Sequence, residues 1–147
     1  MTIPQTSSDL FKRIETSFLR QGMMQSLGVS LLRVESGLCE VSLPHSERVS
    51  QQQGGFHGGA MGALADIAGG YAALTVAAPD MEVTTVEYRI NFLAGFSGGE
   101  LRALGRVVKA GKRIIVTTAE VVHVDSNGKQ TPCALMQQTI VPVPKTY

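Results

Sequence analysis

Apolar and polar residues alternate along most of this chain, which is the pattern of strands that bury one face. Two short strands are predicted at residues 28–36 and 38–44, with Gly37 in a hairpin between them. Beyond Pro79 and Asp80 the sequence becomes rich in β-branched residues. Four further strands are predicted there, separated by turn signals at Gly98-Gly99, Gly111-Lys112 and Asn127-Gly128, and they lie at 82–94, 100–110, 112–125 and 133–143.

Two segments have a helical pattern instead. A short amphipathic helix is predicted to start near Ser8, and the charges around it are unlike the unbroken apolar run of a signal peptide. The run at 58–78, rich in Gly and Ala, predicts one long helix. The order of elements is helix, two strands, long helix, four strands. It predicts the α+β class, with the long central helix against an antiparallel sheet, in a single domain that spans 1–147.

The long helix has one face of large side chains and one of small ones when residues are placed about 100° apart. The large face carries Leu64, Ile67, Tyr71 and Leu74. The small face carries Gly62, Asp66, Gly69, Gly70, Ala73 and Ala77. We expect the large face to pack on the sheet. The small face would let a second element approach the helix backbone, although each helical glycine costs about 1 kcal/mol.

The composition excludes several classes of protein. Apolar residues make up 44% of the chain and charged residues 17%, with a formal net charge of +1, as in an ordinary globular protein. Such a chain lacks the electrostatic footprint of nucleic-acid binding, so no nucleic-acid partner is predicted. The run at 58–78 is nearly long enough to span a membrane. Its few large aliphatic residues and its central Asp66 argue against that, and no membrane association is predicted.

The cysteine and histidine residues predict neither a disulfide framework nor a metal site. Cys39 and Cys133 are far apart and form no CxxC pair, which predicts reduced thiols and a cytoplasmic location. His45, His57 and His123 lack the spacing of metal ligands.

Residues 95–99 match the G-x-S-x-G pattern of a serine hydrolase, with Ser97 at the centre. Such a nucleophile lies between a strand and a helix, and its histidine follows its acid in the chain. Here a second strand follows the pattern and no histidine follows Asp125, so Ser97 is not assigned as a nucleophile.

Asp66 is the single charged residue of the long helix, and two interpretations of it are open. It is either a carboxylate held by structural hydrogen bonds or a general base or nucleophile. The chemical role is suggested by His57, Gly58 and Gly59 at the helix start, where backbone N–H groups at the positive end of the helix dipole suit a polarised oxygen. His57 itself is interpreted first as the N-cap of the helix.

Gly58 and Asp66 cannot act together within one chain. They are eight residues apart, which is about 12 Å along a helix. If both act on one carbonyl, Asp66 must come from a second copy whose helix runs antiparallel alongside. The spacing therefore predicts a twofold homodimer with two shared sites.

The run FHGGAMGALADIAGGYAAL, with Gly54 three residues before His57 and Asp66 nine residues after it, resembles the hotdog-fold acyl-CoA thioesterases of the PaaI (phenylacetic acid degradation) type, in the 4-hydroxybenzoyl-CoA thioesterase superfamily. The order of helix and strands agrees over nearly the whole chain. The resemblance implies a hotdog fold, in which a curved antiparallel sheet wraps a long helix. It also implies homodimers, often tetramers, and hydrolysis of an acyl-CoA thioester without a metal or organic cofactor.

By position, the resemblance assigns Asp66 as the catalytic carboxylate, acting as general base or nucleophile. It assigns Gly58 as the backbone donor that polarises the thioester carbonyl. Gln51, six residues before the histidine, takes the place of a polar side chain that holds the water or the carbonyl. Thr85 matches a strand residue near the carboxylate, and Thr84, one register step away, is the alternative.

The resemblance also suggests residues that bind the substrate. His57 and Gly59 lie at the helix start, and Arg89, Lys112 and Arg113 are candidates for binding coenzyme A at the surface, although solvated surface charge is the favoured interpretation of each one. Candidate walls of an acyl pocket are Met23, Met24, Met61, Met81, Phe92 and Phe96. Two alternative functions remain open: a hydratase or dehydratase of the same fold, and a non-catalytic acyl-CoA-binding protein.

Overall fold

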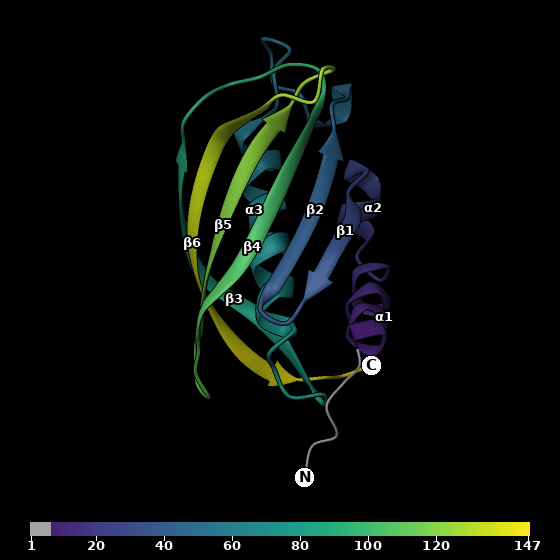
Figure 1. Ribbon diagram of the computed structural model, residues 1–147, viewed down its shortest axis with the longest axis vertical. Coiled ribbons are helices and arrows are strands. Elements are labelled where there is room, and N and C mark those ends of the chain that lie inside the picture. The colour runs from purple at the N-terminus through teal and green to yellow at the C-terminus, as the bar shows by residue number, and fades with distance from the viewer. Residues whose placement is uncertain (1–6) are drawn as a thin grey trace.

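A computed structural model describes residues 7–147, and in it a curved sheet wraps around one long helix (Figure 1). Two helices precede the sheet, α1 (Ser7–Phe18) and α2 (Gly22–Leu27). The long helix is α3 (Gly58–Leu74), which follows a short 3₁₀ turn at Glu47–Val49. The strands are β1 (Ser30–Glu35), β2 (Leu38–Pro44), β3 (Met81–Phe92), β4 (Glu100–Ala110), β5 (Ile115–Val124) and β6 (Gln130–Pro144). The predicted α+β architecture and its six strands are confirmed, and the separate helix α2 was not predicted.

All neighbouring strands of the sheet are antiparallel, in the order β1-β2-β4-β5-β6-β3. β3 does not pair with β4, the next strand in the chain. It crosses to the far edge and pairs with β6 over its whole length. An irregularity between Thr85 and Glu87 shifts the register of β3 there. β3 is therefore an edge strand, and among the described residues only one of its sides has a partner.

The helix backbone of α3 lies directly against the sheet at two glycines. A Cβ added at Gly105 of β4 would overlap the carbonyl group of Ala68 in α3. A Cβ added at Gly69 would overlap the side chains of Gln138 and Thr117 on the sheet. The absence of these two side chains sets how closely α3 and the sheet approach each other.

The predicted division of α3 into a sheet-facing side and a small outer side was therefore partly wrong. Gly69 and Ala73 are buried against the sheet, whereas Ile67 lies beside Asp66 in the wall of a cavity. Beyond Gly58 and Gly59, the residues of α3 that stay half-exposed are Ala63, Asp66, Ile67 and Gly70. The correction follows from the curvature of the sheet, which covers a wider arc of the helix than a flat surface would.

Helices α1 and α2 cover one flank of α3. Phe18 packs edge-on against Tyr71, with 5.9 Å between ring centroids. The Tyr71 hydroxyl lies 2.9 Å from Nε2 of Gln21, which donates to it, and 3.2 Å from Oγ of Ser17. Arg13 donates to the carbonyl oxygens of Ala77, Ala78 and Met81 just beyond the end of α3, where a cation complements the helix dipole.

The described residues 7–147 contain no helix that is long and apolar enough to cross a membrane. Cys39 and Cys133 are both buried free thiols. Burial raises the pKa of Cys39 to about 12 and that of Cys133 to about 11, so neither carries a reactive thiolate near neutral pH. The cytoplasmic location stays a prediction.

The close approach at Gly105 predicts a specific loss of stability. Gly105→Ala should lower the free energy of unfolding by about 1–3 kcal/mol or more. The new methyl group meets backbone of α3, which cannot move aside as a flexible side chain would. Gly70→Ala is the matched control. It has open space for its Cβ and should raise the stability by up to about 1 kcal/mol. Urea unfolding followed by circular dichroism measures both, and a Gly105→Ala protein as stable as wild type would contradict the packing described.

Candidate active site

Asp66 lies midway along α3 with its carboxylate turned toward β3 and β6. The Thr85 hydroxyl donates to its Oδ1 atom at 2.7 Å. Thr85 is therefore the strand residue beside the carboxylate, and the alternative Thr84 is exposed. The structure brings Asp66 and Thr85 together as predicted.

Gln138 is a member of this cluster that the sequence analysis missed. Its Nε2 atom donates to Asp66 Oδ1 and lies 2.9 Å from Thr85 Oγ1. Its Oε1 atom accepts a hydrogen bond from Thr117 at 2.9 Å. A signal was present in the sequence, because a period of two from Ala134 places Met136 and then Gln138 on the buried face of its strand.

Burial raises the pKa of the Asp66 carboxyl above its ordinary value, and the hydrogen bonds from Thr85 and Gln138 offset part of that rise. Burial disfavours the charged carboxylate, whereas the two donors favour it. A carboxyl whose pKa is raised is a stronger base once it is ionised, which suits proton abstraction near neutral pH.

A cavity of about 490 Å³ opens beside Asp66, between α3, β3 and the α1–α2 pair. Asp66, Thr85 and Ile67 form one wall, and Met23 and Met24 of α2 face them. The remaining lining residues are Ser17, Gln21, Gly59, Ala63, Gly70, Tyr71, Glu82, Val83 and Tyr88.

Only two of the six candidate pocket walls line this cavity, namely Met23 and Met24. Met61 is buried in the core, and Met81 lines a separate hollow near the end of α3. Phe92 lies beside Gly58, and Phe96 stacks on His123 with 4.3 Å between ring centroids. Sequence spacing could not separate these roles, because methionine and phenylalanine serve equally well in a core.

His57 is the N-cap of α3, as first interpreted. Its Nδ1 atom accepts a hydrogen bond from the Gly59 backbone N–H at 2.7 Å. In the neutral ring the proton is therefore on Nε2. The Gly59 N–H is occupied by this bond, whereas no described residue accepts a hydrogen bond from the Gly58 N–H. Gly58 thus offers the open backbone donor at the positive end of the helix dipole.

Gln51 lies in the turn that precedes α3 and does not reach Asp66. Its side-chain oxygen accepts from the Gln53 backbone N–H, and its own backbone N–H donates to the Gly55 carbonyl at 2.8 Å. The helix between Gly58 and Asp66 is unbroken, so their separation of about 12 Å holds in the folded chain. Within one chain Gln51 therefore lies in the turn before Gly58, and its contacts are with Gln53 and Gly55 instead of Asp66.

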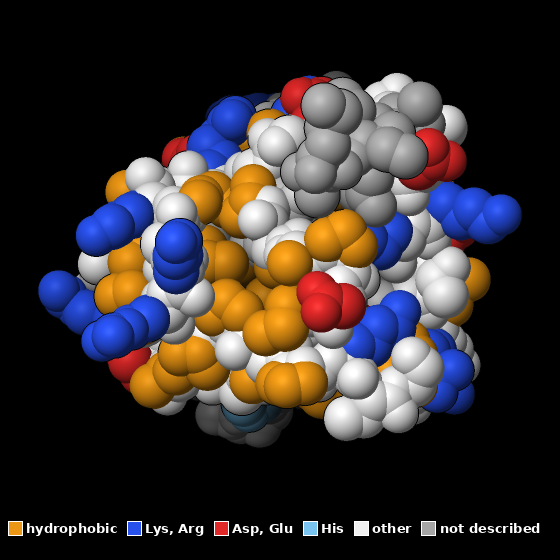
Figure 2. Space-filling view, turned by 90° about the horizontal axis from the view of Figure 1, so that it is seen from below, with side chains coloured by type: hydrophobic (Ala, Val, Ile, Leu, Met, Phe, Trp, Pro, Cys, Tyr) orange, Lys and Arg blue, Asp and Glu red, His pale blue; other side chains and the backbone are white. Residues whose placement is uncertain are grey.

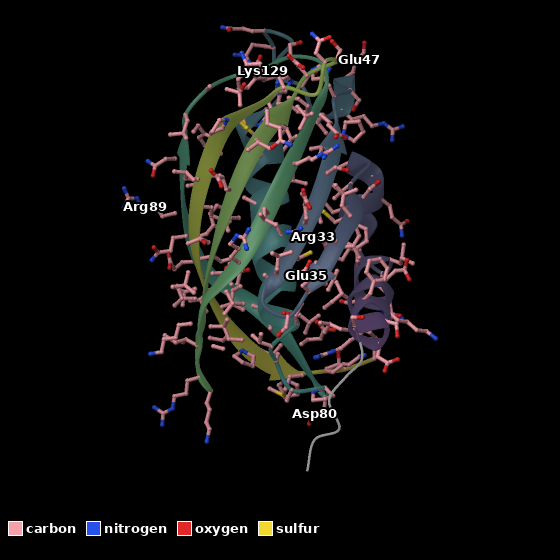
Figure 3. The ribbon with its side chains drawn as sticks, in the orientation of Figure 1. Arg33, Glu35, Glu47, Asp80, Arg89 and Lys129 are labelled. Carbon is pink, nitrogen blue, oxygen red and sulfur yellow. The ribbon has the colours of Figure 1, made fainter. Side chains whose placement is uncertain are left out.

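The three predicted cations lie apart from Asp66 within one chain. Arg89 pairs with Gln137, whose side chain points away from the face that carries Gln138, so Arg89 lies on the outer face of the sheet. Figure 3 shows Arg89 pointing outward. Lys112 and Arg113 are exposed in the β4–β5 turn, near the end of α3 instead of its start. Figure 2, a view of this end, shows Lys and Arg side chains gathered on its left side.

The histidine side chains and Ser97 have structural partners. His45 and His123 each form a hydrogen bond at 2.9 Å through Nε2, with the carbonyls of Gly54 and Gly98. Ser97 lies in the β3–β4 loop and donates to the Gly54 carbonyl at 3.1 Å. Among residues 7–147 no three His, Cys, Asp or Glu side chains are grouped as metal ligands would be.

The chain belongs to the thioesterase superfamily, whose family model matches residues 53–128, more than half of the chain. The matched segment contains the whole of α3 together with Asp66 and Thr85. The enzyme is therefore a thioester hydrolase.

Individual relatives agree with this family. A putative esterase of Saccharolobus solfataricus is 34% identical over 122 residues, which cover 82% of this chain and 85% of the relative. A 1,4-dihydroxy-2-naphthoyl-CoA hydrolase of Listeria monocytogenes is 32% identical over 91 residues, which cover 62% and 74%. The crystal structure of a thioesterase family protein from Silicibacter pomeroyi superposes with a TM-score of 0.89 at 29% identity, covering 92% of this chain and 99% of that one. The predicted hotdog fold is confirmed.

The raised pKa of Asp66 predicts a pH-dependent difference in stability between wild type and Asp66→Asn. Because the pKa of Asp66 is higher in the folded than in the unfolded protein, protonation of Asp66 stabilises the fold at pH values below the ordinary pKa of 3.8. This stabilisation is lost as the pH rises through the pKa of the folded protein. Asp66→Asn keeps an oxygen acceptor for Thr85 and Gln138 but carries no charge. It should therefore unfold at higher urea concentration than wild type at pH 7, and the gap should be smallest at pH 3.5. A variant less stable than wild type at pH 7 would contradict this electrostatic account.

Proposed function

We propose that this chain hydrolyses an acyl-CoA thioester to a free acid and coenzyme A, with Asp66 as the catalytic carboxylate. The observation that carries the proposal is Asp66 itself, a carboxylate with a raised pKa in the wall of a cavity of about 490 Å³. The likeness to the naphthoyl-CoA hydrolase supports a coenzyme A thioester as the substrate. The raised pKa, the cavity and the open helix start are what an acyl transfer to water requires.

The chemistry needs an activated water and a place for the developing negative charge. As a general base, Asp66 takes a proton from water while the oxygen of that water attacks the thioester carbonyl. The carbonyl oxygen becomes an oxyanion, which the Gly58 N–H and the helix dipole stabilise. Collapse of the intermediate breaks the C–S bond and releases the thiolate, which takes up a proton. As a nucleophile, Asp66 would attack the carbonyl carbon and displace the coenzyme A thiolate, forming an acyl anhydride that water then hydrolyses to the free acid and the Asp66 carboxylate.

Two chains are required, because Gly58 and Asp66 are about 12 Å apart on one helix. The free edge of β3 supports such a dimer, since three large apolar side chains are exposed along it: Val86, Tyr88 and Phe92. A long apolar edge strand is normally covered. A twofold axis beside β3 would pair the two β3 strands antiparallel and bring the two α3 helices alongside in opposite directions.

The same arrangement gives the predicted cations a role. Lys112 and Arg113 lie near the end of α3, so in an antiparallel pair the β4–β5 turn of one chain approaches the start of α3 in the other. Coenzyme A carries phosphates that such a basic turn would attract. Arg89 lies on the outer face of the sheet and is the weakest of the three candidates.

The catalytic role predicts that Asp66→Asn loses nearly all turnover while the protein stays folded. Loss of a general base should lower kcat about 10²- to 10⁴-fold. Glu82→Gln is the matched control, because Glu82 lines the same cavity but its carboxylate accepts a hydrogen bond from Tyr147. Release of free thiol from a panel of acyl-CoA substrates measures both variants. Bound acyl-CoA with no thiol release in wild type would instead identify a binding protein.

The donor role of Gly58 can be tested without disturbing the helix. Gly58→Pro removes the N–H at a helix position that tolerates proline, and His57 already has the extended backbone that precedes proline, with φ −69° and ψ 135°. It should lower kcat about 10²- to 10³-fold. Gly58→Ala adds the Cβ against the same Phe92 ring but keeps the N–H, so it should remain active.

Mixing the two inactive proteins tests whether the site is shared. In a dimer of one Gly58→Pro chain and one Asp66→Asn chain, one of the two sites regains both groups. After subunits exchange in an equimolar mixture, about half of the dimers contain one chain of each kind. The mixture should therefore recover about a quarter of wild-type activity. If exchange is verified by mass spectrometry and no activity returns, each site is contained in one chain and the shared-site proposal is wrong.

A further inference from the structure

Gln138 is a fully buried amide in the core, and its contacts connect the sheet to Asp66. It lies on β6 directly opposite Thr117 of β5, and both side chains have no exposed surface. A buried amide is costly unless its polar atoms are paired. Here Oε1 accepts from Thr117, and Nε2 donates to Asp66 Oδ1 and lies within hydrogen-bond distance of Thr85.

The Thr117 hydroxyl and the Asp66 carboxylate together fix the direction in which the amide points. Because Oε1 accepts a hydrogen bond from Thr117, the NH₂ group of Gln138 must face Asp66. The opposite orientation would set the amide oxygen against the Asp66 carboxylate, and the Thr117 hydroxyl, which can donate or accept, would have to turn its proton away from the amide. Thr117 thus acts on Asp66 through Gln138, without touching it.

The helix leaves space for this amide at Gly69. Gly69 follows Asp66 by three residues, so it lies on the same face of α3 one turn later. A Cβ at Gly69 would overlap the Gln138 oxygen and crowd the Thr117 hydroxyl. The gap at Gly69 and the buried Thr117–Gln138 pair therefore form one complementary arrangement.

Both donors act on the same oxygen of the carboxylate. Thr85 and Gln138 each donate to Asp66 Oδ1. None of the described residues donates a hydrogen bond to Oδ2. Among the described residues every buried side-chain nitrogen or oxygen atom has a hydrogen-bond partner. Because Oδ2 has no such partner, it is accessible to solvent. It therefore remains open at the wall of the cavity, where a water molecule or a substrate carbonyl can reach it.

We propose that Gln138 is a positioning residue of the active site, which Thr117 orients and which holds the Asp66 carboxylate with Oδ2 toward the cavity. The proposal rests on the proposed catalytic role of Asp66. It extends that role to two buried residues on separate strands that touch neither substrate nor water in the reaction.

Gln138→Leu removes the amide but keeps a branched side chain, one atom shorter, in the core. Loss of the donor should misplace the carboxylate and lower kcat about 10- to 100-fold with little change in KM. It should also move the acidic limb of the kcat–pH profile to higher pH, because a carboxylate with one donor fewer holds its proton more tightly.

Thr117→Val and Thr117→Ser form the matched pair. Thr117→Val keeps the shape but loses the hydroxyl that orients Gln138, and Thr117→Ser keeps the hydroxyl but loses a methyl group. The Val variant should lower kcat and move the acidic limb in the same direction as Gln138→Leu, and the Ser variant should leave the pH profile in place. If both Thr117 variants move the profile equally, the effect is one of packing and the proposal is overturned.

A titration of Asp66 that does not depend on activity completes the test. Wild type, Gln138→Leu and Thr117→Val are labelled with ¹³C at the aspartate carboxyl carbons, and Asp66→Asn identifies the Asp66 signal. The midpoint should move to higher pH in both variants. An unmoved midpoint with an unmoved kcat profile overturns the positioning role while Asp66 remains essential. If Asp66→Asn keeps full turnover, the proposed function fails instead, and the titration still decides whether Gln138 holds Asp66.

Discussion

The close contact between the backbone of α3 and the sheet is the constraint on which the rest of this structure depends. It is possible because Gly105 of β4 leaves room for the Ala68 carbonyl, and Gly69 of α3 leaves room for Gln138 and Thr117. A methyl group at Gly105 would push the helix backbone away from the strands, and one at Gly69 would displace the side chains of Gln138 and Thr117. Asp66 is carried on the same turn of helix, so the packing distance also sets the distance from its carboxylate to Thr85 and Gln138.

Asp66 combines the two interpretations that its sequence position left open. It is held by structural hydrogen bonds, as a buried carboxylate must be, and those bonds occupy only Oδ1. The other oxygen stays available at the cavity. Partial burial raises its pKa while two neutral donors keep the charged form accessible, which is the compromise that a catalytic carboxylate needs.

Parts of the site could be found from the sequence because they are local. The spacing of His57, Gly58 and Asp66 along one helix determines the cap, the open N–H group and the distance between donor and carboxylate. Gln138 and Thr117 could not be assigned in this way. They become neighbours of Asp66 only through strand pairing, and a slip of one residue would have placed Gln137 there instead.

The sequence by itself determined the number and order of the strands, the long helix, its N-cap and the isolated carboxylate, because these depend on periodicity and on contacts within a few residues. The tertiary structure alone decided that β3 crosses to pair with β6, that Gly69 faces the sheet, and that only Met23 and Met24 of the six candidate residues line the cavity. These outcomes depend on contacts between residues distant in the chain. Strand alternation states which residues share a face, but it does not state which strand lies beside which.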